Sequence, residues 1–229
     1  MNWKKLLILG DSNSQFGYGE SQWISKISDL FQRKCDVINR GFSGYSTEHI
    51  KVILPRLMQE FQPSSICGCL IMLGTNDSTK STNQIQHVTL DRFRENMIWI
   101  IDYLIGFGIE KEKLILISPP RIDDAKWSQE VLTRFGNEST HFDHLVRDYA
   151  RTSIEVAKEK NLVYFDFHQE MLKNDLDYKD YLNDGLHLSI KGGEFLFKNL
   201  EPLLNKHIAN GLEFYFPYWR DITDISKLN

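Results

Sequence analysis

Five short apolar runs recur along the chain, each separated from the next by a segment with helical spacing. The runs cover Lys5 to Leu9, Cys35 to Asn39, Ile66 to Leu73, Leu114 to Ser118 and Leu162 to Phe165. Short runs that stay apolar without alternating are typical of strands buried on both faces, as in a parallel sheet covered by helices. The sequence therefore predicts an α/β fold with a parallel sheet of about five strands.

The segments between these runs carry apolar residues at intervals of three and four, which form one stripe of a helix. The clearest stripe runs from Leu90 to Leu104, with Thr89 as its N-cap and Gly106 or Gly108 as its stop. Four others cover Trp23 to Phe31, Thr47 to Phe61, Phe142 to Val156 and, after the cap Ser189, Ile190 to Leu204. Pro55 lies inside the second of these and is expected to kink or divide it.

No repeat, low-complexity tract or linker divides the 229 residues, so we predict a single domain spanning residues 1–229. A chain of this size hides roughly 70% of its unfolded surface, which lets packing alone stabilise a core. The C-terminal stretch EFYFPYWRDI is different, because five of the six residues from 214 to 219 are aromatic. We expect this tail, residues 213–229, to pack on the domain or on a partner, and a homodimer is one possible outcome.

Charge and cysteine content narrow the class of protein further. The net charge of −4 is spread along the chain, which gives no indication of a nucleic-acid partner. Cys35, Cys67 and Cys69 lie in apolar surroundings and predict buried thiols of a reduced protein; Cys67-Gly-Cys69 lacks the second ligand pair of a metal site. The first apolar run is too short for a secretory signal, and no stretch is long enough to span a bilayer, so we expect a cytoplasmic protein.

The first run ends in Gly10-Asp11-Ser12-Asn13, which would place the hydroxyl of Ser12 at the carboxyl edge of the sheet. Open α/β sheets bind their ligands at this edge, so Ser12 is a candidate nucleophile. An ordinary turn is the alternative, since Gly, Asp, Ser and Asn are turn residues. Taken alone, this motif favours the turn.

Three more motifs stand at the ends of predicted elements and share the same edge. They are Gly41-Phe42-Ser43-Gly44, Gly74-Thr75-Asn76-Asp77 and Asp184-Gly185-Leu186-His187. Each has a simpler explanation as a turn, a helix cap or an exposed histidine. Together with Ser12, however, they supply the four parts that ester hydrolysis requires: a nucleophile, a base, a group that orients the base, and donors for the oxyanion.

The roles follow from the chemistry of each group. His187 is the candidate base for Ser12, and Asp184, three residues before it, would orient the ring and stabilise the imidazolium. The N–H groups of Ser12 and Gly44 and the side-chain amide of Asn76 are candidate oxyanion donors.

Two further carboxylates and two histidines stand close to these motifs. Asp11 and Asp77 are expected to accept hydrogen bonds that fix the loops around Ser12 and Asn76. His141 and His144 would share a helix face, but no third ligand stands at a recognisable spacing. We therefore expect them to be surface histidines, and we expect neither a metal nor a cofactor.

The four motifs resemble those of the SGNH (GDSL-type) hydrolases, with Ser12, Gly44, Asn76 and His187 at the four named positions and Asp184 completing the triad. The resemblance implies a flavodoxin-like three-layer α/β/α sandwich and metal-free ester hydrolysis through an acyl-serine. The isoamyl acetate-hydrolysing esterase branch is similar in four stretches: NRGFSGY, QHVTLDRFRENM, YLNDGLHLSIKGGEFLF and PYWRD. The chain departs from that branch at Thr75, at residues 46–49 and near Ile190, and changes at 46–49 could reshape the substrate pocket.

These observations predict a cytoplasmic serine esterase that acts on small, short-chain carboxylic esters of the acetate type. A thioesterase, a lysophospholipase or a carbohydrate O-acetylesterase on the same scaffold is the alternative, because fold and triad do not fix the substrate. A catalytically silent binding protein that uses the aromatic tail as an interface is a further alternative, although Ser12, Asp184 and His187 are all present.

Overall fold

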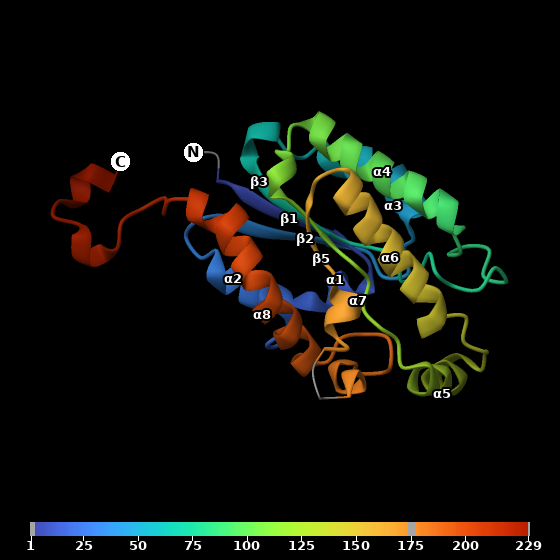
Figure 1. Cartoon of the computed structure of the whole chain (residues 1–229). Helices are drawn as coiled ribbons and strands as arrows, with labels where there is room; N and C mark the ends of the chain where they lie inside the picture. The colour runs from blue at the N-terminus through green and yellow to red at the C-terminus, as the bar shows by residue number, and fades with distance from the viewer. Residues whose placement is uncertain (1–2, 174–176, 229) are drawn as a thin grey trace.

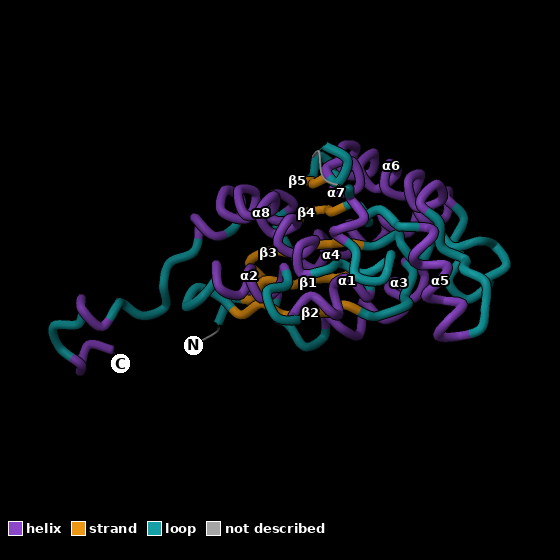
Figure 2. Tube along the Cα trace, turned by 90° about the horizontal axis from the view of Figure 1, so that it is seen from below, coloured by secondary structure: helices purple, strands orange, loops and turns teal. Residues whose placement is uncertain are grey.

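The computed structural model describes residues 3–173 and 177–228. Its strands form one parallel sheet in the order β2-β1-β3-β4-β5 (Figure 2). The strands are β1 (Lys5–Gly10), β2 (Asp36–Gly41), β3 (Ile66–Met72), β4 (Leu114–Ile117) and β5 (Val163–Phe165). All five apolar runs are therefore strands, as the sequence predicts, and the parallel α/β fold is confirmed.

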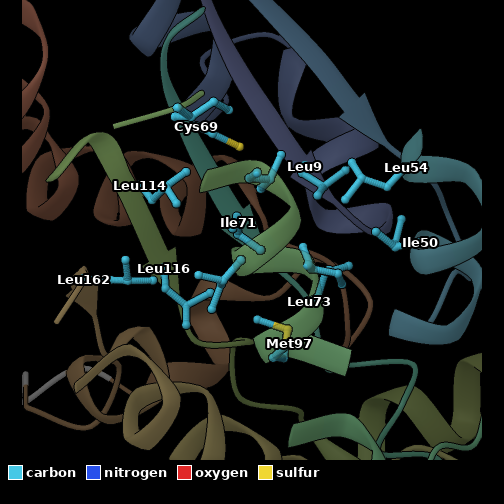
Figure 3. Close-up of a cluster of buried hydrophobic side chains, with 14 of the residues drawn as sticks. Leu9, Ile50, Leu54, Cys69, Ile71, Leu73, Met97, Leu114, Leu116 and Leu162 are labelled. Carbon is cyan, nitrogen blue, oxygen red and sulfur yellow. The ribbon is translucent and has the colours of Figure 1, made fainter. Parts of the chain in front are cut away.

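Helices cover both faces of the sheet and complete three layers (Figure 1). One face carries α3 (Thr47–Met58), α4 (Leu90–Phe107) and α6 (Asp143–Glu159), and the other carries α2 (Trp23–Leu30) and α8 (Ile190–His207). Side chains alternate along β1, so Leu7 and Leu9 contact the first layer while Leu6 and Ile8 contact the second. Figure 3 shows the first of these two cores, where Leu9 and Ile71 of the sheet face Leu54 of α3.

The ends of the predicted helices follow the expected caps in most cases. Thr89 is the N-cap of α4, and Gly108, rather than Gly106, ends that helix in a left-handed conformation with φ of 112°. The hydroxyl of Ser189 accepts a hydrogen bond from Gly192 N and caps α8. Pro55 does not divide α3, which continues through it to Met58 although the proline lacks the N–H that would bond to the Lys51 carbonyl.

Three helices have no counterpart in the apolar pattern: α1 (Ser12–Gln15), α5 (Asp124–Phe135) and α7 (Phe167–Glu170). Two of them are single turns, which are too short to show a period. The third, α5, lies away from the sheet (Figure 1) and buries only Trp127 and Val131, against a small cluster that includes Leu186. Single 3₁₀ turns occupy Phe16–Tyr18, Pro63–Ser65, Lys111–Lys113, Tyr178–Tyr181, Ala209–Gly211, Trp219–Asp221 and Ile225–Leu228.

An irregularity in β3 separates the two neighbouring cysteines. The register against β1 shifts between Lys5 and Leu6, which pair with Ile66 and Gly68. This shift places Cys67 in the core under α2 and α8, and Cys69 in the core under α3 and α4. The two thiols therefore lie on opposite faces of the sheet and share no site.

After α8 the C-terminal tail passes the amino ends of β1 and β2, where Tyr215 contacts the body, and then extends away from it (Figure 1). The Tyr215 ring stacks on Trp3 with centroids 3.8 Å apart, and its hydroxyl accepts a hydrogen bond from Lys4 N. Beyond this contact, Trp219 is 77% exposed. Within residues 3–173 and 177–228, the helices lack the length and apolar character needed to cross a membrane.

Candidate active site

The side chains of Ser12, His187 and Asp184 form one continuous hydrogen-bonded chain. His187 Nε2 lies 3.0 Å from Ser12 Oγ, and His187 Nδ1 lies 2.7 Å from Asp184 Oδ2. A carboxylate on Nδ1 holds the proton there, which leaves Nε2 as the acceptor for the serine proton. The residues that the sequence analysis assigned to nucleophile, base and orienting group thus meet, although 175 positions separate Ser12 from His187.

Ser12 reaches this position because β1 ends in a crowded turn. A Cβ on Gly10 would lie 2.1 Å from Ser14 Oγ and 2.9 Å from Met72 O, so glycine is required there. The Asp11 carboxylate accepts a hydrogen bond of 2.9 Å from Asn13 N and caps α1, which begins at Ser12. The strand end and the cap together aim the serine hydroxyl at the carboxyl edge of the sheet.

The His187 segment is held from two sides. Gly185 has φ of 97°, and a Cβ there would lie 2.5 Å from Trp127 N, so the turn fits closely against α5. Asn13, beside the serine, accepts a hydrogen bond of 3.0 Å from Leu188 N and donates one of 3.5 Å to Leu186 O. Asn13 was not among the predicted site residues. Its position next to Ser12 is the one feature of the sequence that could have identified it.

Asp184 is suited to remain ionised. Burial alone would raise its pKa, but hydrogen bonds from the His187 ring and from the N–H groups of His187 and Leu186 outweigh burial and lower the pKa to about 2. The carboxylate therefore stays charged at neutral pH and stabilises a protonated His187.

The predicted oxyanion donors belong to the turns that follow β1, β2 and β3 at the carboxyl end of the parallel sheet. Gly44 follows β2 with φ of 79°, a left-handed conformation that favours glycine. Among the described residues, the N–H groups of Ser12 and Gly44 have no acceptor, whereas Asn76 Nδ2 donates to Tyr45 O at 3.0 Å. A primary amide has two N–H groups, so Asn76 keeps one for a substrate oxygen.

Asp11 and Asp77 lie under these loops and are completely buried. Asp77 Oδ1 accepts hydrogen bonds from Thr47 N and Thr47 Oγ1 and thereby ties the end of β3 to the start of α3. Burial is the main cause that raises the pKa of Asp11 to about 6 and that of Asp77 to about 7. Asp11 thus accepts a bond from the loop around Ser12, whereas Asp77, next to Asn76, accepts its bonds from Thr47.

The prediction that His141 is a surface residue is wrong. Its side chain is only 8% exposed, and its Nε2 lies 3.4 Å from Asn76 Oδ1. The burial comes from Trp127 of α5, whose ring meets the His141 ring edge-on, and α5 was not visible in the apolar pattern. Burial and the nearby charge of His187 lower the pKa of His141 to about 4, so its ring is neutral at neutral pH. His144 is exposed, as expected.

Aromatic rings enclose His187 and lead into a cleft. Trp127 and Phe16 both meet the His187 ring edge-on, with centroids 5.7 and 5.5 Å away. Phe16 is 53% exposed at the rim. A cleft of about 790 Å³ extends from Trp127 and His141; it is lined by Lys80, Thr82, Asn83, Gln86, Trp127, Val131, Phe135, Asn137, Glu138, Ser139, Thr140 and His141.

The chemistry available here is acyl transfer by an activated serine. Within the described ranges, no group of three or more His, Cys, Asp or Glu side chains has the geometry to hold a metal ion. The arrangement supplies a nucleophile, a base with a charged partner, and candidate oxyanion donors from three loops.

Comparison with known proteins places this geometry in a family. The profile of the GDSL-like Lipase/Acylhydrolase family matches residues 8–194. The isoamyl acetate-hydrolyzing esterase 1 homologue of Bos taurus is 41% identical over 97% of this chain and 89% of its own length, and the Homo sapiens homologue is 36% identical over the same shares. The isoamyl acetate-hydrolyzing esterase of Saccharomyces cerevisiae is 25% identical, with 98% and 97% covered.

Solved structures agree in fold. The lipase/acylhydrolase from Enterococcus faecalis superposes with a TM-score of 0.67 at 23% identity, covering 92% of this chain and 98% of the other. The acetyl xylan esterase AlAXEase gives 0.66 at 20% identity, covering 86% and 98%. The extent of the family match and of the identity to the esterase homologues shows that this chain belongs to the GDSL-like (SGNH) lipase/acylhydrolase family and is a carboxylic-ester hydrolase.

Proposed function

We propose that the protein hydrolyses small, short-chain carboxylic esters of the acetate type through an acyl intermediate on Ser12. The observation that carries the proposal is the hydrogen-bonded chain from Ser12 Oγ through His187 to Asp184, with distances of 3.0 and 2.7 Å. The names of the isoamyl acetate-hydrolyzing relatives support the small-ester substrate class.

In this mechanism, His187 Nε2 takes the proton of Ser12 as Oγ attacks the ester carbonyl. The oxyanion that forms is stabilised by the N–H groups of Ser12 and Gly44 and by the free N–H of Asn76. His187 then gives its proton to the leaving alcohol. A water molecule, deprotonated by the same ring, attacks the acyl-serine and releases the acid.

The substitution Ser12→Ala tests this mechanism. We expect turnover of 4-nitrophenyl acetate to fall by about 10⁴-fold or more, because the nucleophile is lost while the fold remains. Ser25→Ala is the matched control, since the Ser25 hydroxyl bonds only to the backbone of the exposed turn before α2. Wild-type turnover by folded Ser12→Ala protein would contradict the proposal.

A second substrate class is favoured by the cleft. Its wall combines the aromatic rings of Trp127 and Phe135 with amide and hydroxyl side chains, a mixture suited to the face and the hydroxyl groups of a sugar. The structural neighbour AlAXEase is an acetyl xylan esterase. An O-acetylated carbohydrate is therefore the second candidate substrate.

A substrate panel separates the classes. Acetate, butyrate and longer acyl esters of one alcohol, together with an acetylated xyloside, an acyl thioester and a lysophospholipid, would be compared by kcat/KM. A steep fall beyond short acyl chains supports the small-ester proposal, and a preference for long chains contradicts it. Faster hydrolysis of the acetylated xyloside than of isoamyl acetate would move the substrate class to carbohydrates.

A binding protein without activity is distinguished by a chemical probe. A fluorophosphonate reacts only with an activated serine, so labelling of Ser12 would exclude this alternative and its absence on folded protein would support it.

The remaining parts of the proposal concern location and assembly. We place the reaction in the cytoplasm because the three cysteines are free thiols, and we assign it no cofactor. The exposed aromatic tail supports a homodimer. Sedimentation of the intact protein and of a form cut before Glu213 would test this; monomers in both cases would contradict the dimer.

A further inference from the structure

Gln86 lies in the loop between β3 and α4 and contacts two of the oxyanion loops at once. Its Nε2 lies 2.9 Å from Gly44 O and 3.2 Å from Asn76 Oδ1. A primary amide carries two N–H groups, and each of these has one acceptor here. The Gln86 side chain therefore joins the turn after β2 to the turn after β3.

The orientation of the Gln86 amide follows from its partners. Its Oε1 accepts a hydrogen bond of 2.6 Å from Asn83 Nδ2, and Asn83 Oδ1 accepts one of 3.3 Å from the backbone N of Gln86. Turning the amide over would bring Oε1 against two other oxygens, Gly44 O and Asn76 Oδ1. Only one orientation satisfies every group, so the donors of Gln86 point at the oxyanion loops.

The same reasoning fixes the Asn76 amide. Its Oδ1 accepts from Gln86 Nε2 at 3.2 Å and lies 3.4 Å from His141 Nε2, while its Nδ2 donates to Tyr45 O at 3.0 Å. The pKa of His141, lowered to about 4 by burial, keeps this ring neutral, with a proton on one nitrogen available for Asn76. With Oδ1 and one N–H held, the Asn76 amide is fixed in orientation, and its second N–H has no acceptor among the described residues.

These bonds close a ring across the two loops. From Asn76, one path runs through Nδ2 to Tyr45 O, and the other runs through Oδ1 and Gln86 to Gly44 O, the neighbouring carbonyl. We propose that Gln86 is a positioning residue: by closing this ring it holds Gly44 and Asn76 at the separation that an oxyanion requires. The proposal rests on the proposed serine mechanism, and Gln86 itself does not touch the reacting atoms.

The substitution Gln86→Met tests the proposal, because methionine has a similar length and offers no N–H donor. Preorganised donors act on the transition state and less on the bound ester, so we expect kcat for 4-nitrophenyl acetate to fall by about tenfold with KM nearly unchanged. Gln32→Met is the matched control, since Gln32 is an exposed glutamine that bonds only to Asp29. Unchanged kcat in Gln86→Met would overturn the proposal.

A second measurement separates positioning from a general effect on folding. Methylboronic acid adds to an active serine and imitates the tetrahedral intermediate, so its inhibition constant depends on the oxyanion donors. We expect this constant to rise in Gln86→Met by the same factor by which kcat/KM falls. A lower melting temperature with unchanged inhibition and unchanged kcat per folded molecule would assign Gln86 a structural role and overturn the proposal.

A double-mutant cycle shows whether Gln86 acts through Asn76. In an Asn76→Ala background, Gln86→Met should lower kcat/KM by clearly less than it does in the wild-type protein, because one of its two targets is absent. Equal factors in both backgrounds would overturn the proposal.

Ser12→Ala, measured alongside, keeps the two hypotheses separate. An active Ser12→Ala contradicts the serine mechanism, whereas an inactive Ser12→Ala with fully active Gln86→Met contradicts only the role of Gln86.

Discussion

At the carboxyl end of the sheet, polar side chains are buried and hold one another, whereas the aromatic side chains of the C-terminal tail remain largely exposed. Ser12 is 3% exposed and has its partner His187 at 3.0 Å. In the tail, the rings of Phe214 and Tyr218 instead contact the Arg33 guanidinium, whose Cζ lies 5.0 and 4.3 Å from their centroids.

The difference shows what makes an unusual stretch of sequence into a defined site. The polar motifs of the carboxyl end come from four separate segments and contact one another only after folding, so the bonds between segments close long loops of chain. The tail concentrates its aromatic residues in one segment and meets the body through few side chains, including Trp3 and Arg33. In this protein, polar motifs that contact one another across the chain form the candidate active site, whereas aromatic residues gathered in one segment form an exposed surface.

The largest expected effect comes from breaking the charged end of the hydrogen-bonded chain. Asp184→Asn keeps the shape of the side chain but removes the charge that fixes the His187 tautomer, so we expect kcat to fall by about 10⁴-fold. The same substitution in the triad of a serine protease lowers kcat by about 10⁴-fold. Turnover of 4-nitrophenyl acetate by the purified variant measures it.

Asp180→Asn is the control for this substitution, because Asp180 lies in the same segment but forms an exposed ion pair with Lys191 at 2.8 Å. We expect Asp180→Asn to keep wild-type kcat. A loss below tenfold in Asp184→Asn would show that its charge is not needed by His187.

Asn13→Ala removes the two hydrogen bonds that join Asn13 to the segment carrying His187. It leaves the buried Leu188 N–H without its acceptor and frees the segment that carries His187. We therefore expect the free energy of unfolding to fall by up to about 3 kcal/mol. Activity should fall by about tenfold as His187 loses its fixed position. Urea unfolding and kcat measure the two effects. Asn199→Ala is the control, because the Asn199 side chain bonds to Phe195 O within its own helix, α8. If both the free energy of unfolding and kcat stay at their wild-type values, Asn13 has no role in positioning His187.

The fold was predictable from the sequence because its strands and main helices bury regular apolar patterns. The stripe through Leu90 and Leu104 continues for the whole of α4, and each apolar run matches a strand. The inner strands β1, β3 and β4 are buried, whereas the edge strands β2 and β5 are only partly buried. By contrast, α5 could not be predicted, because Trp127 and Val131 are its only buried residues within the described chain, and two residues define no period.

The candidate site was predictable where a motif sits at the end of a strand, and not where the partner comes from elsewhere. Ser12 and His187 each carry their own local motif. Gln86 and His141 are ordinary residues in the sequence, and what gives them a role is Asn76, which lies 10 and 65 positions away from them. The burial of His141 also depends on α5, so missing that helix led to the wrong expectation for the histidine.

The buried carboxyls make the stability of the carboxyl end depend on pH in two opposite ways. The pKa of Asp184 lies below its usual value, so its contribution is present above about pH 4 and is lost as the pH falls toward about 2. The pKa of Asp77 is raised to about 7, so its contribution is present below about pH 4 and is lost as the pH rises through 7.

We therefore expect the free energy of unfolding to decrease by about 4 kcal/mol between pH 4 and pH 8 on account of Asp77. Asp77→Asn should flatten this part of the profile, because the amide does not ionise. Urea titrations at several pH values measure the slope, which is independent of the absolute stability of the variant. An unchanged slope would mean that Asp77 ionises with an ordinary pKa.

The smallest effect is expected in the tail. Arg33 donates hydrogen bonds to Phe216 O and Pro217 O and lies over the Phe214 and Tyr218 rings, so Arg33→Ala removes the principal cation that holds the tail. Exposed cation–π contacts contribute only about 0.5 to 1 kcal/mol each. The tail contacts the rest of the protein at the amino end of the sheet, whereas Ser12 lies at the carboxyl end. We expect faster amide hydrogen exchange in residues 213–219 with the global unfolding free energy and kcat nearly unchanged, whereas the exposed-surface Arg151→Ala of α6 should leave tail exchange as it is. A loss of activity in Arg33→Ala as large as that in Asn13→Ala would mean that the tail and the carboxyl end are coupled, and that the contrast between them does not hold in solution.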